Sequence, residues 1–287
     1  MSTFITSSSA PLRIGTVSLR VNDLAGISHF YQTVLGLQLI DQSDGIVQLG
    51  AGNRAFLELV GDTAAPRSAP TEAGLFHTAF LLPERADLGS WVYHLARNRF
   101  SFQGASDHAV SEALYLTDPE GNGIEVYVDR PSSQWPYHDG KLGMVTERLD
   151  LNNLMAAAQG REWQGAPAGS IIGHVHLQVG ATAQADAFYA DALGLDITAR
   201  YPGASFFGSG GYHHHLAGNI WNSRNATRHT SGATGLRQVE LLAADPATYD
   251  KTVAGLEAAG VALHPQTSGI RIEDPWGTSL SLRQKPI

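Results

Sequence analysis

The sequence FYQTVLGL at residues 30–37 returns as FYADALGL at residues 188–195. The segments before them match as well, since IGTVSLRV starts at Ile14 and IGHVHLQV starts at Ile172. A repeat of this kind indicates that one structural unit occurs more than once, so it decides the architecture before any single motif does. In each copy the alternating apolar segment predicts a strand, the Phe-Tyr segment predicts a helix, and the glycine near its end predicts the helix terminus.

The same pattern divides each half of the chain again, which gives four modules in the order βαβββ. The expected first strands of the modules cover residues 14–21, 74–80, 171–179 and 236–242. The expected helices run from Asn22 or Asp23 to Leu35 and over residues 85–98, 183–193 and 246–259. An Asp-Pro turn precedes the last strand of modules two and four. The chain is therefore expected to be of the α+β class.

The repeat also predicts the domain organisation. The expected boundaries are a disordered lead over 1–11, an N-terminal domain over 12–130 with modules at 12–62 and 74–130, a connection over 131–167, and a C-terminal domain over 168–287 with modules at 168–222 and 235–287. The connection is rich in proline, glycine and charge, with a short helix expected near residues 150–159. One module leaves a sheet edge open, whereas two can curl into a cup-shaped pocket with the helices outside.

The composition is that of a globular protein without a nucleic-acid or membrane partner. The formal net charge is −8, so no basic surface is offered to nucleic acid or to an anionic membrane. No apolar run reaches the ~20 residues that span a bilayer, and the first residues lack the apolar core of a secretion signal. We therefore expect a cytoplasmic protein. Because the chain has no cysteine, any metal would bind to nitrogen and oxygen ligands.

Together with DPEGNGIEVY at residues 118–127, the repeated motifs resemble the vicinal oxygen chelate superfamily, which includes glyoxalase I, bleomycin-resistance proteins and type I extradiol dioxygenases. GLFHTAFLLP from Gly74, IGHVHLQV from Ile172 and GGYHHHLAGNIW from Gly210 are most similar to its bacterial catechol 2,3-dioxygenase branch. The matching segments cover nearly the whole chain after residue 12. The resemblance implies two tandem domains with curved mixed sheets, and a metal bound between paired modules.

In that superfamily the metal ligands come from the first and last strands of paired modules. The corresponding positions are Thr16, His77, His174 and Gln238 in the first strands, and Glu58, Glu125, Leu216 and Ser281 in the last strands. Module two thus offers both a histidine and a glutamate, and module three offers a histidine. Module four offers no strong ligand.

How the modules pair decides which of these residues meet, and the sequence leaves the pairing open. If module two pairs with three, His77, His174 and Glu125 converge into a two-histidine, one-carboxylate set, which suits Fe(II) because it leaves coordination positions open. If module one pairs with two, Glu58, His77 and Glu125 form a site nearer to the glyoxalase pattern. If module three pairs with four, His174 lacks strong partners. The first pairing is favoured, because it alone completes the triad.

The resemblance also implies an acid/base histidine beside the metal, a role that imidazole can fill near neutral pH. The sequence predicts a strand over residues 212–221, in which alternation places His214 on the inward face with Tyr212. His213 and His215 would then point the other way. His214 is therefore the candidate for this role.

Two more residues are candidates for catalysis or for lining the pocket. His176 shares a strand face with His174, and Tyr127 shares one with Glu125. The aromatic side chains expected to line the pocket are Phe206, Phe207 and Trp221.

The hypothesis from the sequence is extradiol cleavage of a catechol-like aromatic by dioxygen. Fe(II) is the preferred metal, and Mn, Ni and Zn are other candidates. The partners would be the small aromatic substrate and dioxygen, and an oligomer of identical chains is compatible with the sequence. Two alternatives stay open: a glyoxalase-type lyase or isomerase that uses Glu58, His77 and Glu125, and a non-catalytic resistance-type protein that binds a small aromatic ligand.

Overall fold

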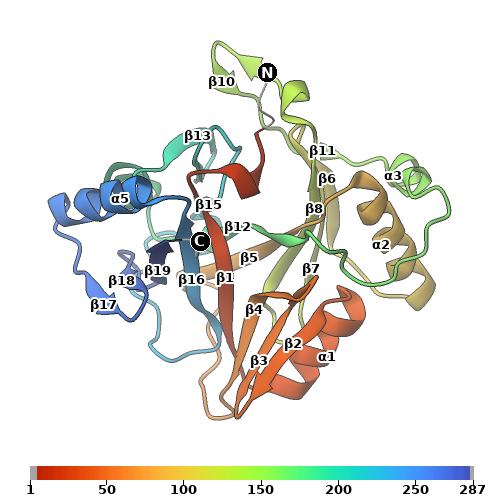
Figure 1. Ribbon diagram of the computed structural model, residues 1–287, viewed down its shortest axis with the longest axis horizontal. Coiled ribbons are helices and arrows are strands. Elements are labelled where there is room, and N and C mark those ends of the chain that lie inside the picture. Colours follow the sequence, from red (N-terminus) through yellow and green to blue (C-terminus); the bar gives the residue numbers. More distant parts are fainter. Residues whose placement is uncertain (1–4, 285–287) are drawn as a thin grey trace. The chain divides into compact units, whose positions relative to one another are not determined.

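The computed structural model describes residues 5–284 (Figure 1). The chain forms two compact units, and each combines segments from both halves of the sequence. Unit one comprises Met1–Arg20, Ala65–Phe76 and Gly173–Ile287, and unit two comprises Val21–Ala64 and His77–Ile172. The domain boundaries expected from the repeat follow the sequence rather than these units, and they stay a prediction.

Unit two contains two groups of strands, and the first belongs to module one. The strands β2 (Gln38–Ser43), β3 (Ile46–Ala51) and β4 (Arg54–Gly61) form antiparallel pairs in the order β4-β3-β2. The helix α1 (Leu24–Val34) packs against β3 and β4. It begins as expected, because the Asp23 carboxylate accepts a hydrogen bond from the backbone N–H of Gly26.

The second group of unit two has the order β11-β6-β7-β8-β5. Its strands are β5 (Gly74–Leu81), β6 (Gly104–Asp107), β7 (Ser111–Thr117), β8 (Gly123–Asp129) and β11 (Glu147–Arg148). β5 and β8 are parallel and the other pairs are antiparallel, so the sheet is mixed. The helix α2 (Arg85–Asn98) packs on β8, and α3 (Leu151–Ala157) packs on α2. The short strands β9 (Tyr137–His138) and β10 (Lys141–Leu142) pair with each other.

Unit one has the strand orders β17-β18-β19-β16-β1 and β12-β15-β14-β13. The strands of the first group are β1 (Leu12–Val21), β16 (Gly235–Ala243), β17 (His264–Gln266), β18 (Gly269–Glu273) and β19 (Ser279–Gln284). Those of the second are β12 (Ile171–Gln178), β13 (Asp196–Tyr201), β14 (Ala204–Gly208) and β15 (Leu216–Asn219). The helices are α4 (Thr182–Ala185), which continues as a π-helix over Asp186–Ala192, and α5 (Pro246–Ala258).

The pairing of β1 with β16 joins the first strands of modules one and four. It is antiparallel and runs from Leu12 opposite Ala243 to Arg20 opposite Gly235. In Figure 1 the red β1 lies beside the blue β16. β16 has β19 on its other edge, so it cannot also pair with β12. β1 and β5 belong to different sheets. The pairings of module one with two and of three with four are therefore wrong for this chain.

A tyrosine–aspartate contact joins the two repeated signatures in each half of the chain. The hydroxyl of Tyr31 lies 3.4 Å from Asp118 Oδ2, and that of Tyr189 lies 2.8 Å from Asp274 Oδ2. Each tyrosine comes from a Phe-Tyr helix and each aspartate from an Asp-Pro turn. Burial raises the pKa of both aspartates above the ordinary carboxyl value. The Phe-Tyr helix and the Asp-Pro turn, which recur in both halves of the sequence, therefore contact each other within each half.

The α+β class and the repeated βαβββ order are confirmed, but three local predictions differ from the structure. The predicted strand over 212–221 begins only at Leu216. The βαβββ order requires the strands β6, β17 and β18, but the sequence analysis assigned no residues to them. Residues 5–11, expected to be disordered, include a 3-10 helix at Ser7–Ser9 with Ser7 and Ala10 buried, and residues 1–4 lie outside the described part. In residues 5–284, no helix has both the length and the apolar character that crossing a bilayer would require.

Candidate functional site

Two of the predicted metal ligands meet inside unit two. His77 lies on β5 and Glu125 on the adjacent parallel strand β8, and both side chains are buried. The atoms Nε2 of His77 and Oε2 of Glu125 are 2.9 Å apart. β5 and β8 are parallel neighbours in which Ala79 stands opposite Glu125. Because side chains alternate along a strand, His77, two residues before Ala79, faces the same side as Glu125.

This spacing fits two ligands of one divalent ion. Imidazole nitrogen and carboxylate oxygen bind such ions at about 2.0–2.2 Å, so two neighbouring ligand atoms at right angles lie about 3 Å apart. A buried carboxylate also needs a compensating partner, and a cation bound beside it would be one. The donor set and its geometry therefore fit a metal.

A tyrosine and a third histidine, which were not among the sequence candidates, extend this group. Tyr115 on β7 stands opposite Glu125 in the β7–β8 hairpin. Its pKa is raised well above the ordinary value by burial and by the charge and hydrogen bond of Glu125. The Tyr115 hydroxyl lies 2.7 Å from Nε2 of His108, whose Nδ1 lies 2.6 Å from the carbonyl oxygen of Val145.

The position of Tyr115 could have been predicted from the expected turn at residues 118–122. A hairpin closed at that turn fixes which residue stands opposite Glu125, and that residue is Tyr115. The contact of His108 with Val145 joins the hairpin to the connection between the halves, and no local pattern predicts it. A carbonyl oxygen only accepts, so Nδ1 of His108 carries a proton in this arrangement.

The third predicted ligand lies in unit one beside the predicted acid/base residue. His174 on β12 is buried, and its ring centroid lies 4.1 Å from that of His214. Nδ1 of His214 is 2.8 Å from Nδ1 of His213, so one of the two nitrogens donates and the other accepts. The structure thus brings His174 and His214 together, and their roles as metal ligand and acid/base stay a prediction.

The strand alternation used to orient His214 is nevertheless wrong. Gly210 and Gly211 both have positive φ, 62° and 80°, so the chain turns there and no strand forms until Leu216. His213, His214 and His215 are all buried instead of alternating between two faces. Burial, and to a lesser extent the neighbouring His213, lower the pKa of His215 from 6.5 to about 3.

The repeat and this geometry agree with what comparison with known proteins shows. The sequence model of the Glyoxalase/Bleomycin resistance protein/Dioxygenase superfamily matches residues 13–126 and again residues 171–282. The chain belongs to this superfamily. The two matches confirm the two tandem domains of the expected fold.

The known relatives differ in the share of this chain that they match. A catechol-2,3-dioxygenase of Bacillus subtilis is 36% identical over 276 residues, which are 94% of this chain and 96% of that protein. Biphenyl-2,3-diol 1,2-dioxygenase 3 of Rhodococcus globerulus is 27% identical over 135 residues, which are 45% of this chain and 71% of that protein. The solved structure of a Bacillus subtilis protein, described as a candidate dioxygenase, covers 96% of this chain and 86% of its own, with a TM-score of 0.67 and 13% identity. This last likeness shows the fold alone.

Thr16 on β1 and Glu58 on β4, the superfamily positions of module one, lie outside the sheet that carries His77 and Glu125. On β16, the carboxylate of Glu240 forms an ion pair with Arg283 and accepts the backbone N–H of Thr16 at 3.1 Å. The sheet of modules one and four therefore uses this acidic side chain in an ion pair.

Aromatic side chains continue from His214 along unit one. Phe206 lies 5.1 Å from the His214 ring and 5.8 Å from the His176 ring, and Trp221 lies 5.5 Å from His176. Phe207 is fully buried and packs on Tyr189. The role of all three aromatic residues in lining a pocket stays a prediction.

The amide of Asn219 holds the ring of His176. Asn219 accepts the backbone N–H of Trp221 with Oδ1, which directs its Nδ2 to within 3.0 Å of Nε2 of His176. Because an amide nitrogen only donates, Nε2 of His176 accepts and its proton lies on Nδ1. Tyr127 is fully buried and packs with Ala79 and Ala113 in unit two, on the same face of β8 as Glu125. The catalytic role expected for Tyr127 stays a prediction.

Proposed function

We propose that this chain opens a catechol-like aromatic ring by extradiol dioxygenation, with Fe(II) held by His77, Glu125 and His174. The observation that carries the proposal is the likeness over 94% of the chain to a catechol-2,3-dioxygenase. That likeness supports an enzyme of the extradiol dioxygenase kind, and such an enzyme requires a catalytic metal. The substrate class, the metal and the ligand set follow from the side chains.

The pairing of modules two and three, on which the ligand set depends, is supported by elimination. β1 and β16 occupy one another, which leaves the first strands of modules two and three to pair. Each of the three residues offers one ligand atom, and all three side chains are buried. Two neutral imidazoles and one carboxylate leave a divalent ion with a net charge near +1 and open positions for substrate and dioxygen. When bound, Fe(II) would supply the redox chemistry that joins dioxygen to a catecholate.

The residues around the ligands would handle protons and orient the ring. His214 lies against His174 and would accept a phenolic proton from the substrate and return it later. His213 holds Nδ1 of His214 and would fix which ring nitrogen faces the substrate. Phe206 and Trp221, with His176 between them, would provide an apolar wall for a flat ring.

Metal content and turnover of two variants test the proposal. The protein is purified without oxygen, its metal is quantified, and catechol is assayed for the yellow ring-opened product. His174→Ala should remove the metal, because it deletes one of three ligands. His214→Ala should retain the metal and lose turnover by about 100-fold or more. His264→Ala, on the exposed strand β17, is the matched control and should change neither.

Each alternative gives a different result in the same assay. Full metal content in His174→Ala would overturn the ligand set. Zinc or nickel with activity on a hemithioacetal would favour the glyoxalase-type reaction. Neither metal nor turnover would favour a protein that binds a small aromatic ligand without changing it.

A further inference from the structure

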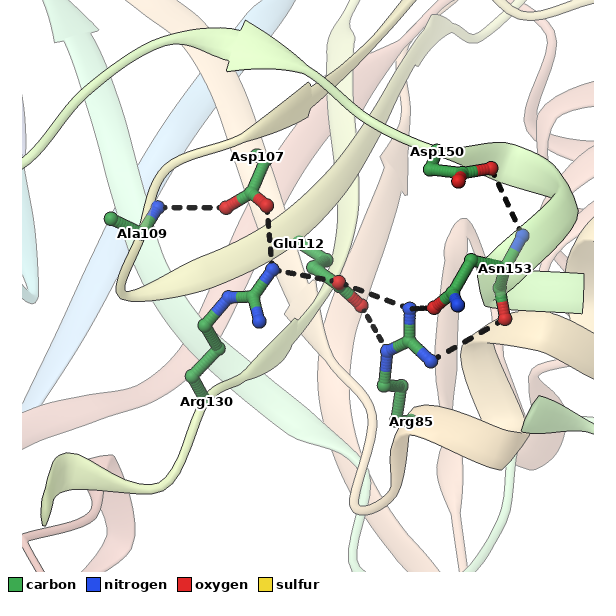
Figure 2. Close-up of polar contacts among 7 residues, drawn as sticks. All are labelled: Arg85, Asp107, Ala109, Glu112, Arg130, Asp150 and Asn153. Carbon is green, nitrogen blue, oxygen red and sulfur yellow. Dashed lines mark hydrogen bonds and ion pairs between the residues drawn. The ribbon is translucent and has the colours of Figure 1, made fainter. Parts of the chain in front are cut away.

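Figure 2 shows a charged network of two arginines, Arg85 and Arg130, and two carboxylates, Asp107 and Glu112, in unit two. Asp107 precedes His108, the partner of Tyr115, in the sequence. Nη2 of Arg130 lies 2.6 Å from Oδ2 of Asp107 and 2.9 Å from Oε1 of Glu112, so a single nitrogen bridges two carboxylates. On its other side, Glu112 binds Arg85 through Nε at 2.6 Å and Nη2 at 3.2 Å. Glu112 is only 3% exposed, so these contacts compensate a buried charge.

Figure 2 shows that the network continues into the connection between the halves. Nη2 of Arg85 donates to Oδ1 of Asn153 at 2.8 Å, and Asp150 accepts the backbone N–H of Asn153 at 3.0 Å. Asn153 lies on α3, so the network ties α3 and α2 to the hairpin of β6 and β7. The connection therefore supports the sheet that carries Glu125.

Asp107 shapes the turn that carries His108. Its Oδ1 accepts the backbone N–H of Ala109 at 2.9 Å, while its Oδ2 faces Arg130. Ala109 has φ 65°, a left-handed conformation that alanine adopts only when its surroundings impose it. His108, between Asp107 and Ala109, is thus presented by a strained turn that Arg130 and Asp107 together hold in place.

We propose that Arg130, through Asp107, is a positioning residue for the site, because it holds His108 where its Nε2 meets the Tyr115 hydroxyl beside Glu125. The inference rests on the proposed function in one respect only, that Glu125 is a metal ligand. Groups that hydrogen-bond to a ligand carboxylate without binding the metal themselves orient that carboxylate and set its charge distribution. Within residues 5–284, the ion pairs of Arg130 are with Asp107 and Glu112, so its effect on His77 and Glu125 must pass through the turn.

A double-mutant cycle tests whether Arg130 acts through His108. Arg130→Met is made in the unmodified chain and in a His108→Gln background, and kcat, KM and bound iron are measured with catechol. In the unmodified chain kcat should fall by about 10- to 100-fold with the iron content retained. In the His108→Gln background the same change should alter kcat by less than about twofold, because the residue through which Arg130 acts is already gone. Equal losses in both backgrounds would overturn the proposal.

A second measurement needs neither metal nor turnover. Long-range proton–nitrogen NMR of the metal-free protein reports which ring nitrogen of His108 is protonated. The unmodified chain should show a proton fixed on Nδ1, and Arg130→Met should show a mixture of both tautomers. An unchanged His108 spectrum in Arg130→Met would overturn the positioning role. Absence of ring cleavage by the unmodified chain would count against the proposed function alone.

Two further variants guard against simple loss of folding. Arg97→Met removes an arginine whose ion pair with Glu162 is largely exposed, and it should change neither kcat nor the His108 spectrum. If Arg130→Met does not fold, Asp107→Asn keeps the hydrogen bond to Ala109 and removes only the charge that faces Arg130. That variant should show the same mixed tautomers, and a single tautomer would again overturn the proposal.

Discussion

Burial holds the pKa of His215 at about 3, against 6.5 for an exposed imidazole. An unfolded chain takes up a proton on this ring as the pH falls through 6.5, whereas the folded chain does so only near 3. The folded state therefore loses stability on this account between those two values, by up to about 4–5 kcal/mol at the acid end. Above pH 7 neither state binds the proton and the effect vanishes.

We predict that His215→Asn makes the free energy of unfolding less dependent on pH between 6.5 and 4. Urea denaturation at pH 7.5, 6 and 5 measures this for the variant and the unmodified chain. Asp118 and Asp274 have raised pKa values and act in the opposite direction, but they are present in both proteins and cancel in the comparison. Parallel stability–pH curves for the two proteins would show that His215 takes up its proton in the folded state as well.

The sequence predicts single site residues well where a motif position carries them and poorly where tertiary structure brings them. His77 and Glu125 were named because the resemblance to the superfamily implies metal ligands at these strand positions, and the two residues are adjacent in the structure. His214 lies beside His174 in the structure, but the strand used to orient it does not form at that position. Two glycines turn the chain before His214. His108 could not be named, because its contact with Val145 spans the connection between the halves.

At the scale of helices and strands, the two tyrosine–aspartate contacts differ in length, so we predict different costs for removing them. Tyr189→Phe deletes a hydroxyl 2.8 Å from Asp274 and should lower the free energy of unfolding by about 1–2 kcal/mol. Tyr31→Phe deletes one at 3.4 Å, which is near the limit of a hydrogen bond, and should cost less. Urea denaturation of the two variants compares them directly. A larger loss in Tyr31→Phe would contradict the order given by the distances.

Helices were predicted more accurately than short strands. The helix expected over 85–98 matches α2, and that over 246–259 matches α5 to one residue. β6 and β17 escaped prediction because they are short and lack alternation between apolar and polar residues. β18 alternates as GIRIE, with its two isoleucines buried, so its pattern was readable.

At the scale of the whole molecule, module pairing was the feature that the sequence left open. All three ways of pairing the modules are compatible with the same local sequence patterns. The antiparallel pairing of β1 with β16 shows that module one pairs with module four. Because unit one combines the start of the chain with its C-terminal half, we predict that residues 168–287 expressed alone do not form a stable fold. Removing β1 would leave the edge of β16 without its partner.

Circular dichroism and size-exclusion chromatography test this prediction. The fragment 168–287 should aggregate or lack a cooperative thermal transition, and addition of a fragment 1–167 should restore one. A monomeric fragment that melts cooperatively without its partner would contradict the prediction.

The pairing of β1 with β16, which are more than 200 residues apart in the sequence, also has a consequence for synthesis on the ribosome. Translation at about 5–20 residues per second delivers β16 roughly 10–45 s after β1, and until then the edge of β1 that pairs with β16 has no partner strand. A nascent polypeptide of this design cannot complete the sheet of its first strand until residues 235–243 have left the ribosome. Factors that shield exposed strand edges during this interval should therefore raise the yield of folded protein.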